Sequence, residues 1–208
     1  MVGTEVPATV RVTQEGRFRQ GEGQPWMPFT AEEVYTTNPP GFLWKTEMRM
    51  APLFSIVGRD RYAEGHGSVD MRLLGVLPIA QASGPAMDQG ALVRYLSETI
   101  WFPAAVLGPA ITWEAVAADS ARATISHGGV SASAIFFFDD QGRPVDMVAE
   151  RQDLGRGRLE TWSTPSTAWG EFGGVRIPVA GGALWRYDSG DLVYIELRIT
   201  GVEVNPPG

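Results

Sequence analysis

The sequence predicts a mainly β protein: a single antiparallel, open (half) β-barrel of roughly a dozen strands, plugged by one amphipathic helix at about residues 88–102. Two observations carry this prediction. Apolar and polar residues alternate along most of the chain, which is typical of half-buried strands. One segment instead repeats its apolar residues with a helical period. The 208 residues contain no internal repeat and no low-complexity linker, so we expect one β-rich domain over residues 1–208.

The alternation is clearest in the first quarter of the chain and again near its middle. One face would carry Phe42, Trp44, Thr46, Met48 and Met50. A later strand would place Val130, Ala132, Ala134, Phe136 and Phe138 on one face. Because successive side chains of a strand point to opposite faces, each set predicts a continuous apolar surface on one side of the sheet.

Turn-forming residues separate these strands. Residues 139–142 (Asp-Asp-Gln-Gly) and 188–191 (Asp-Ser-Gly-Asp) are strong reversal signals. The pairs Gly173-Gly174 and Gly181-Gly182 predict further tight bends, and residues 76–89 predict the longest loop. This spacing is typical of a meandering antiparallel sheet or barrel.

The helical period runs from Asp88 to about Phe102. Asp88 is the expected N-cap, and Pro103 is expected to stop or kink the helix. At about 100° per residue, one arc of the helix carries Leu92, Val93, Tyr95, Leu96, Thr99 and Ile100. A lone amphipathic helix among many strands is best buried by packing this arc on the concave side of the sheet.

A second stripe of the helix consists of Arg94, Glu98 and Trp101. Arg94 and Glu98 are four residues apart and can pair, and Arg94 can also stack on Trp101. Two interpretations stay open. The stripe is a solvent-exposed helix face, or it lies at a pocket mouth where Arg94 holds a carboxylate or phosphate head group bidentately.

The aromatic and methionine residues on the strand faces also allow two interpretations. Trp44, Met48 and Met50 form either ordinary core or an adaptable apolar pocket. Seven tryptophans in a chain of this length favour a cavity, because a wide barrel must be filled by bulky side chains or by a ligand. In the pocket interpretation, the ligand-binding residues are Trp44, Met48, Met50, Arg94, Tyr95, Trp101, Phe136 and Phe138.

Catalytic residues are harder to identify from this sequence. Glu98 with Asp60 or His66 could perform acid–base chemistry if the helix crosses the cavity, because burial raises the pKa of a carboxyl group. Alternatively, such carboxylates pair with neighbouring arginines, as Asp60 would with Arg59 and Glu150 with Arg151, and His66 lies in an exposed turn. The two histidines and the absence of cysteine predict no metal site, and no phosphate-binding glycine loop predicts a nucleotide, so no cofactor is expected.

Charge and hydropathy exclude some partners. The formal net charge of −7, without any cluster of Lys or Arg, predicts no nucleic-acid binding. No apolar run approaches the ~18–20 residues that span a bilayer, so the chain as given is expected to be soluble, in a compartment that the sequence leaves open.

Five stretches together resemble a known family: residues 26–33, 39–44, 48–52, 94–98 and 101–103. Over nearly the whole chain they are similar to an uncharacterised bacterial family, a domain of unknown function. Many of its members carry N-terminal membrane helices, so the resemblance implies that any membrane association comes through a segment absent from this chain. More loosely, the strands around one long helix resemble the open half-barrel of bacterial lipoprotein-carrier proteins.

Three functions follow as hypotheses. The leading one is binding of an apolar or amphipathic small molecule, or a lipid, in the barrel cavity. The alternatives are a cofactor-independent hydrolase or isomerase that uses cavity carboxylates, and a structural or partner-docking domain without a deep pocket.

Overall fold

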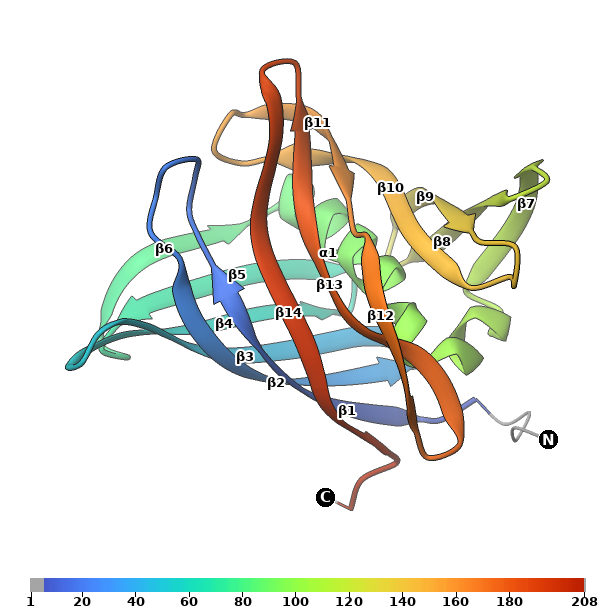
Figure 1. The fold of residues 1–208 in the computed structure, drawn as a ribbon, viewed down its shortest axis with the longest axis horizontal. Helices are drawn as coiled ribbons and strands as arrows, with labels where there is room; N and C mark the ends of the chain where they lie inside the picture. The colour runs from blue at the N-terminus through green and yellow to red at the C-terminus, as the bar shows by residue number, and fades with distance from the viewer. Residues whose placement is uncertain (1–5, 208) are drawn as a thin grey trace.

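Fourteen β-strands form one open, strongly curved antiparallel sheet in the computed structural model, which describes residues 6–207 (Figure 1). This confirms the predicted fold class. The strands are β1 (Thr9–Phe18), β2 (Met27–Thr37), β3 (Pro40–Ala51), β4 (Phe54–Ala63), β5 (His66–Leu73), β6 (Leu77–Ser83), β7 (Ile111–Ala117), β8 (Ser120–His127), β9 (Val130–Phe138), β10 (Pro144–Asp153), β11 (Arg158–Ser163), β12 (Ser166–Phe172), β13 (Val175–Tyr187) and β14 (Gly190–Val204).

The sheet has two wings that meet where the two ends of the chain pair. Its strand order is β6-β5-β4-β3-β2-β1-β14-β13-β11-β10-β9-β8-β7, and β12 pairs with β13 beside this path. The first strand pairs with the last, from Val10 opposite Val204 to Phe18 opposite Ile195. The edge strands β6 and β7 are therefore the ones joined by the helical segment of the chain.

The helix lies in the concavity between the wings (Figure 1). Helix α1 (Pro85–Glu98) packs against β4 and β5 on one wing and against β9 and β10 on the other. Leu92, Val93 and Leu96 are fully buried, which confirms that the predicted apolar arc faces the sheet. Burial of this arc on two walls at once fixes the position of the helix.

The predicted helix bounds need correction. The α-helix begins at Pro85, not Asp88, because Gly84 and Pro85 provide a start: proline presets the backbone angle of the first helical position. The Asp88 carboxylate instead accepts a hydrogen bond from the Gly67 amide of β5 (2.7 Å). After Glu98 the chain continues in two short 3-10 helices, η1 (Thr99–Trp101) and η2 (Pro103–Leu107).

Two further predictions of local structure are wrong. Residues 76–89 are not a loop, because β6 lies within them as an edge strand. Its side chains are mostly exposed on both faces, so the alternating pattern of a half-buried strand is missing. Gly181 and Gly182 do not bend the chain, because β13 runs straight through them. They allow close approach instead: a Cβ on Gly182 would lie 2.4 Å from the Ile195 carbonyl oxygen.

The predicted apolar face of residues 42–50 is confirmed except at its last residue, Met50. Phe42, Trp44 and Met48 are buried, whereas the residue Met50 is 55% exposed. The pairing of β3 with β4 shifts register between Arg49 and Ala51, and this irregularity turns Met50 away from the core.

The contact between β5 and the helix can be tested at Gly67. A Cβ at this position would lie 2.4 Å from the Met87 carbonyl oxygen and 2.8 Å from the Ala91 Cβ. We expect Gly67→Ala to lower the free energy of unfolding by about 1–3 kcal/mol, measured by urea denaturation. Gly21→Ala is the control, since its Cβ would meet only Gln24, at 3.8 Å. Equal stability of both variants would show that the helix does not pack closely on β5.

Candidate functional site

A cavity of about 190 Å³ lies between the helix and the concave face of the sheet. Both wings contribute to its wall, and residues 178–183 of β13 run along it. The helical segment contributes Arg94, Ser97, Glu98, Ile100 and Trp101. The second stripe of the helix thus lines an internal space.

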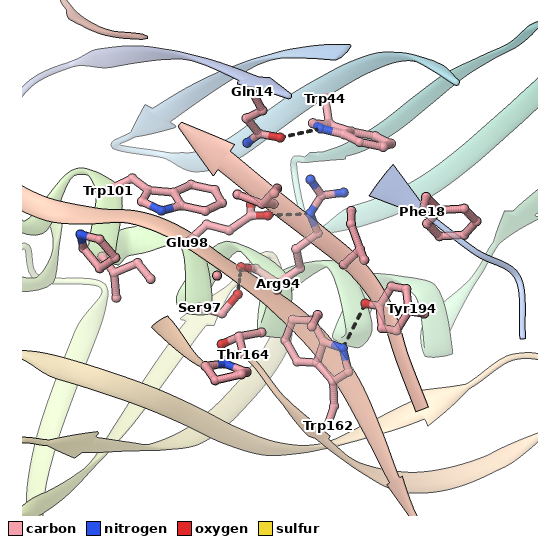
Figure 2. A pocket seen from close by; sticks show the side chains of 18 of the residues that line it. Gln14, Phe18, Trp44, Arg94, Ser97, Glu98, Trp101, Trp162, Thr164 and Tyr194 are labelled. Carbon is pink, nitrogen blue, oxygen red and sulfur yellow. Dashed lines mark hydrogen bonds and ion pairs between the residues drawn. The ribbon is translucent and has the colours of Figure 1, made fainter. Parts of the chain in front are cut away.

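Aromatic side chains converge on this cavity from separate strands. In Figure 2, Trp44 and Trp162 lie on opposite sides, Trp101 lies at one end, and Phe18 and Tyr194 lie at the other. The Trp162 indole nitrogen donates a hydrogen bond to the Tyr194 hydroxyl (2.9 Å), so these two rings support each other. The apolar wall also includes Met48, Met71, Ile100, Ile195 and Leu197.

One guanidinium and three carboxylates lie together at one side of the cavity; we call Arg94, Glu33, Asp60 and Glu98 the Arg94 cluster, and all of them except Glu33 line the cavity. Arg94 donates to Glu33 of β2 (2.9 Å), Asp60 of β4 (2.6 Å) and Glu98 of its own helix (2.8 Å). The Arg94 side chain is only 14% exposed and the Glu33 side chain is fully buried. The cluster therefore ties α1 to two strands through charge-assisted hydrogen bonds in a dry environment.

Neutral side chains complete the cluster. The Gln14 amide nitrogen donates to Glu33 (3.0 Å), and the Gln14 oxygen accepts from the Trp44 indole (3.0 Å). The Tyr35 hydroxyl donates to Glu98 (3.2 Å). The Arg94 guanidinium also lies over the Trp44 ring, 5.0 Å from its centroid. These contacts satisfy buried polar atoms, although one Asp60 oxygen has no partner within residues 6–207.

Burial changes the protonation of the Arg94 cluster. It raises the pKa of Glu33 well above the usual range, although the neighbouring Arg94 acts in the opposite direction. Burial also raises the pKa of Glu98, again against the effect of Arg94. For Arg94, burial lowers the pKa, but the surrounding carboxylates outweigh it and hold the pKa well above its usual value. One fixed cation therefore faces two carboxyl groups, Glu33 and Glu98, that bind protons more readily than in water.

The interpretation of this stripe as a solvent-exposed helix face is wrong. Arg94 and Glu98 form the predicted pair four residues apart, but the concave sheet covers both. Stacking of Arg94 on Trp101 was predicted, and this is wrong. The Arg94 guanidinium lies over Phe42 and Trp44 instead, because it points toward β3. The predicted pairing of Asp60 with Arg59 is also wrong. Consecutive strand residues point to opposite faces, so Asp60 points inward to Arg94.

The structure brings six of the predicted site residues together. They line the same cavity and come from the strand face, the helix stripe and η1: Trp44, Met48, Asp60, Arg94, Glu98 and Trp101. Their grouping requires the helix to lie across β3 and β4. No spacing within the sequence specifies that arrangement.

The other predicted site residues lie elsewhere. Tyr95 points away from the cavity and donates to the Thr36 carbonyl (3.0 Å). The buried Phe136 packs against Trp113 in the other wing, and its strand neighbour Phe138 also lies outside the cavity lining. Met50 is exposed beyond the register shift. The His66 side chain is 83% exposed on a hairpin, 3.7 Å from Asp88.

Sequence reasoning missed several cavity residues. Simple alternation along β14 would place Ile195 and Leu197 on the inner face and Tyr194 on the outer one. The pairing of β13 with β14 shifts register at Leu184, opposite Val193, and both Tyr194 and Ile195 line the cavity. Bulges of this kind carry no clear sequence signal.

Arg151 and Trp162 were also missed, although both lie on inner faces of adjoining strands. Neighbouring residues suggested that Arg151 pairs with Glu150, but Glu150 accepts a hydrogen bond from Thr161 (2.8 Å) on the opposite face. The Arg151 guanidinium lies over the Trp162 ring, 4.6 Å from its centroid. Alternation along β10, with Met147 and Ala149 buried, could have placed Arg151 on the inner face.

The fold and the cavity define this protein as an open antiparallel half-barrel. Among solved structures it is similar to a LolA superfamily protein from Nitrosomonas europaea, with 11% sequence identity, 99% of this chain and 91% of that chain covered, and a TM-score of 0.50. It is also similar to a DUF1329 family protein from Desulfovibrio piger, with 9% identity, coverage of 97% and 88%, and a TM-score of 0.52. These likenesses show a shared fold and confirm the predicted architectural resemblance to open half-barrels.

The chain itself belongs to the family of unknown function DUF6544, whose profile matches residues 1–197. This confirms the resemblance to a family of that kind. No curated protein sequence matches the chain. Within the described residues, no helix is long and apolar enough to cross a membrane. The same part of the chain holds no group of three or more His, Cys, Asp or Glu residues arranged to bind a metal ion.

The raised carboxyl pKa values predict a dependence of stability on pH. A carboxyl group with a higher pKa in the folded state binds its proton more tightly when folded, so its stabilising effect is lost as the pH rises above the unfolded value of 4.5. Glu98→Gln removes one such group. We expect the stability of this variant relative to the wild type to increase as the pH rises from 4.5 toward neutrality.

Urea denaturation at a series of pH values measures this difference. Glu47→Gln is the control, because Glu47 is exposed on the opposite face of β3. A difference between Glu98→Gln and the wild type that stays constant over the whole pH range would contradict the raised pKa.

Proposed function

We propose that the protein binds a small apolar or amphipathic molecule in the cavity between α1 and the sheet. The carrying observation is the partly open space of about 190 Å³ whose wall consists mainly of aromatic, methionine and aliphatic side chains. Apolar ligand surface that moves from water onto such a wall contributes about 25 cal/mol per Å² to binding. A cavity of about 150 Å³ with similar walls is large enough to bind benzene.

The size of the cavity indicates the size of the ligand. Pockets that enclose drug-sized molecules measure about 300–1,000 Å³. At about 190 Å³ this cavity fits one ring or one short alkyl chain better than a lipid with several chains. Trp44, Met48 and Trp101 would contact the apolar part of the ligand, together with Phe18 and Trp162.

The Arg94 cluster has a different role in this proposal. The Arg94 donors are already bound to three carboxylates, so binding a head group would require displacing one of them. We infer that Arg94 holds the helix over the cavity and does not contact the ligand head group.

The alternative functions receive less support. Asp60 and Glu98 line the cavity but are both bound to Arg94, and His66 lies outside it, so these three groups do not form one acid–base site. A partner-docking domain does not require such an apolar space. The fold shared with a LolA superfamily protein supplies the concave sheet but does not identify the ligand.

A series of uncharged straight-chain alcohols, from hexanol to dodecanol, tests the proposal by calorimetric titration. Each added methylene should strengthen binding about fourfold, from about 0.8 kcal/mol per buried methylene, until the chain outgrows the cavity. Affinity for the best alcohol should reach the micromolar range. Folded protein that shows no saturable binding of any alcohol would refute the proposal.

A variant that fills the cavity provides a second test. Ala183 is buried and lines the cavity, so Ala183→Leu should weaken binding of the best alcohol by about tenfold or more. Ala117→Leu is the matched control, since Ala117 is exposed on the edge strand β7. Equal binding by both variants, each with native thermal stability, would place the ligand outside this cavity.

A further inference from the structure

Arg151 is a cation on the cavity wall with no carboxylate partner. Its Nε donates to the Gly90 carbonyl of α1 (3.1 Å), and its guanidinium lies over the Trp162 ring at 4.6 Å. Among residues 6–207 the two terminal nitrogens form no hydrogen bond and no ion pair. Stacking on the indole holds the plane of the guanidinium and leaves its outer edge free to donate.

The acidic residues nearest in sequence are engaged elsewhere. Glu150 accepts a hydrogen bond from Thr161. Asp153 accepts from the Tyr187 hydroxyl (2.7 Å) and from the amides of Gly155 and Arg156. Glu150 lies on the opposite face of β10, and neither residue forms an ion pair with Arg151.

The positive charge of Arg151 and the excess negative charge of the Arg94 cluster differ in how they can be neutralised. Burial raises the pKa of Glu33 and Glu98, so these two groups take up protons more readily than they would in water. A guanidinium does not lose its proton in proteins, so a partly buried arginine without a counterion keeps its full charge. Within the cavity wall, Arg151 is therefore a positive charge that an anionic ligand group can pair with.

On the same side of the cavity as Trp162, another polar group lacks a partner among the described residues. The Thr164 hydroxyl is buried and forms no hydrogen bond to any described residue. Thr164 and Trp162 lie on the same side of the cavity, opposite Gln14 and Trp44 (Figure 2). A buried hydroxyl left without a partner costs about 1–3 kcal/mol, and a ligand oxygen that accepts its hydrogen bond removes that cost.

We propose that the ligand is a single-chain amphiphile with an anionic head group, carboxylate or phosphate, that pairs with Arg151 while its chain lies against the aromatic wall. This inference rests on the proposed function and specifies the head group at the same site. It assigns to Arg151 the role that the sequence suggested for Arg94. Planar, bidentate pairing with such an anion is the geometry for which a guanidinium is suited.

Four ligands with the same octyl chain test the head group: octanoate, octyl phosphate, octanol and octylamine. We expect wild-type protein at neutral pH and low salt to bind octanoate or octyl phosphate at least about tenfold more tightly than octanol, and octylamine most weakly. The tighter of the two anions identifies the head-group class. Added salt should weaken binding of the anions and leave octanol unchanged.

Arg151→Gln should reduce anion binding about tenfold or more and leave octanol binding unchanged. Arg19→Gln is a closely matched control. Arg19 also donates its Nε to a backbone carbonyl, that of Val193, and also lies over a tryptophan, Trp26, at 4.6 Å, but outside the cavity lining. The Arg19→Gln variant should bind all four ligands as tightly as the wild type does.

The possible outcomes separate the two proposals. Octanol binding as tight as octanoate binding, or tighter binding of octylamine, would overturn the anionic head group and leave the apolar cavity intact. An equal loss in Arg19→Gln and Arg151→Gln would overturn the role of Arg151. Failure of all four ligands to bind would overturn the proposed function itself. Should Arg151→Gln not fold, the wild-type order of affinities and its salt dependence still decide the question.

Discussion

The position of α1 depends on one buried guanidinium. Arg94 joins Glu33 of β2, Asp60 of β4 and Glu98 of the helix itself, so a single side chain connects three elements of the fold. Taking these charges out of water is costly, and removing one partner of a buried pair typically destabilises a protein by roughly 3–5 kcal/mol. Such a cluster contributes less to total stability than to geometry, because its hydrogen bonds form at one helix position only.

The cavity follows from that geometry. The cluster fixes the helix against β2 and β4, whereas the walls formed by β13 and β14 lie on the other side of the space. Two glycines in β13, at positions 181 and 182, bring neighbouring backbone close where side chains would otherwise stand. The protein thus places its most polar interior group and its apolar cavity next to each other. Aromatic rings such as Trp44 contact both.

Local patterns predicted the parts of this arrangement that local forces determine. Alternation identified Trp44 and Met48, and the helical period identified the pairing of Arg94 with Glu98. Prediction failed where neighbours distant in sequence decide the outcome. Register shifts reversed the faces of Met50 and Tyr194, and an edge strand with two exposed faces showed no alternation.

The charged residues show the same limit. A helix stripe with Arg94 and Glu98 has the composition of a solvated face, and only the surrounding sheet makes it interior. Conversely, the free cation Arg151 was assigned a partner from its sequence neighbour, which lies on the opposite face of β10. Periodicity predicts on which side of a strand or helix a side chain lies. Which charged residues pair with each other depends on how the strands and helices pack together.

The pairing of β1 with β14 has a consequence for how the molecule is made. The strands at the centre of the sheet come from the two ends of the chain, so the two wings join only after the last strand has left the ribosome. Until then β1 is an unprotected edge able to pair with another chain. Contacts between such distant residues also slow folding. Assembly of the sheet therefore ends at its centre. Before β14 is available, no backbone hydrogen bonds join the two wings of the sheet.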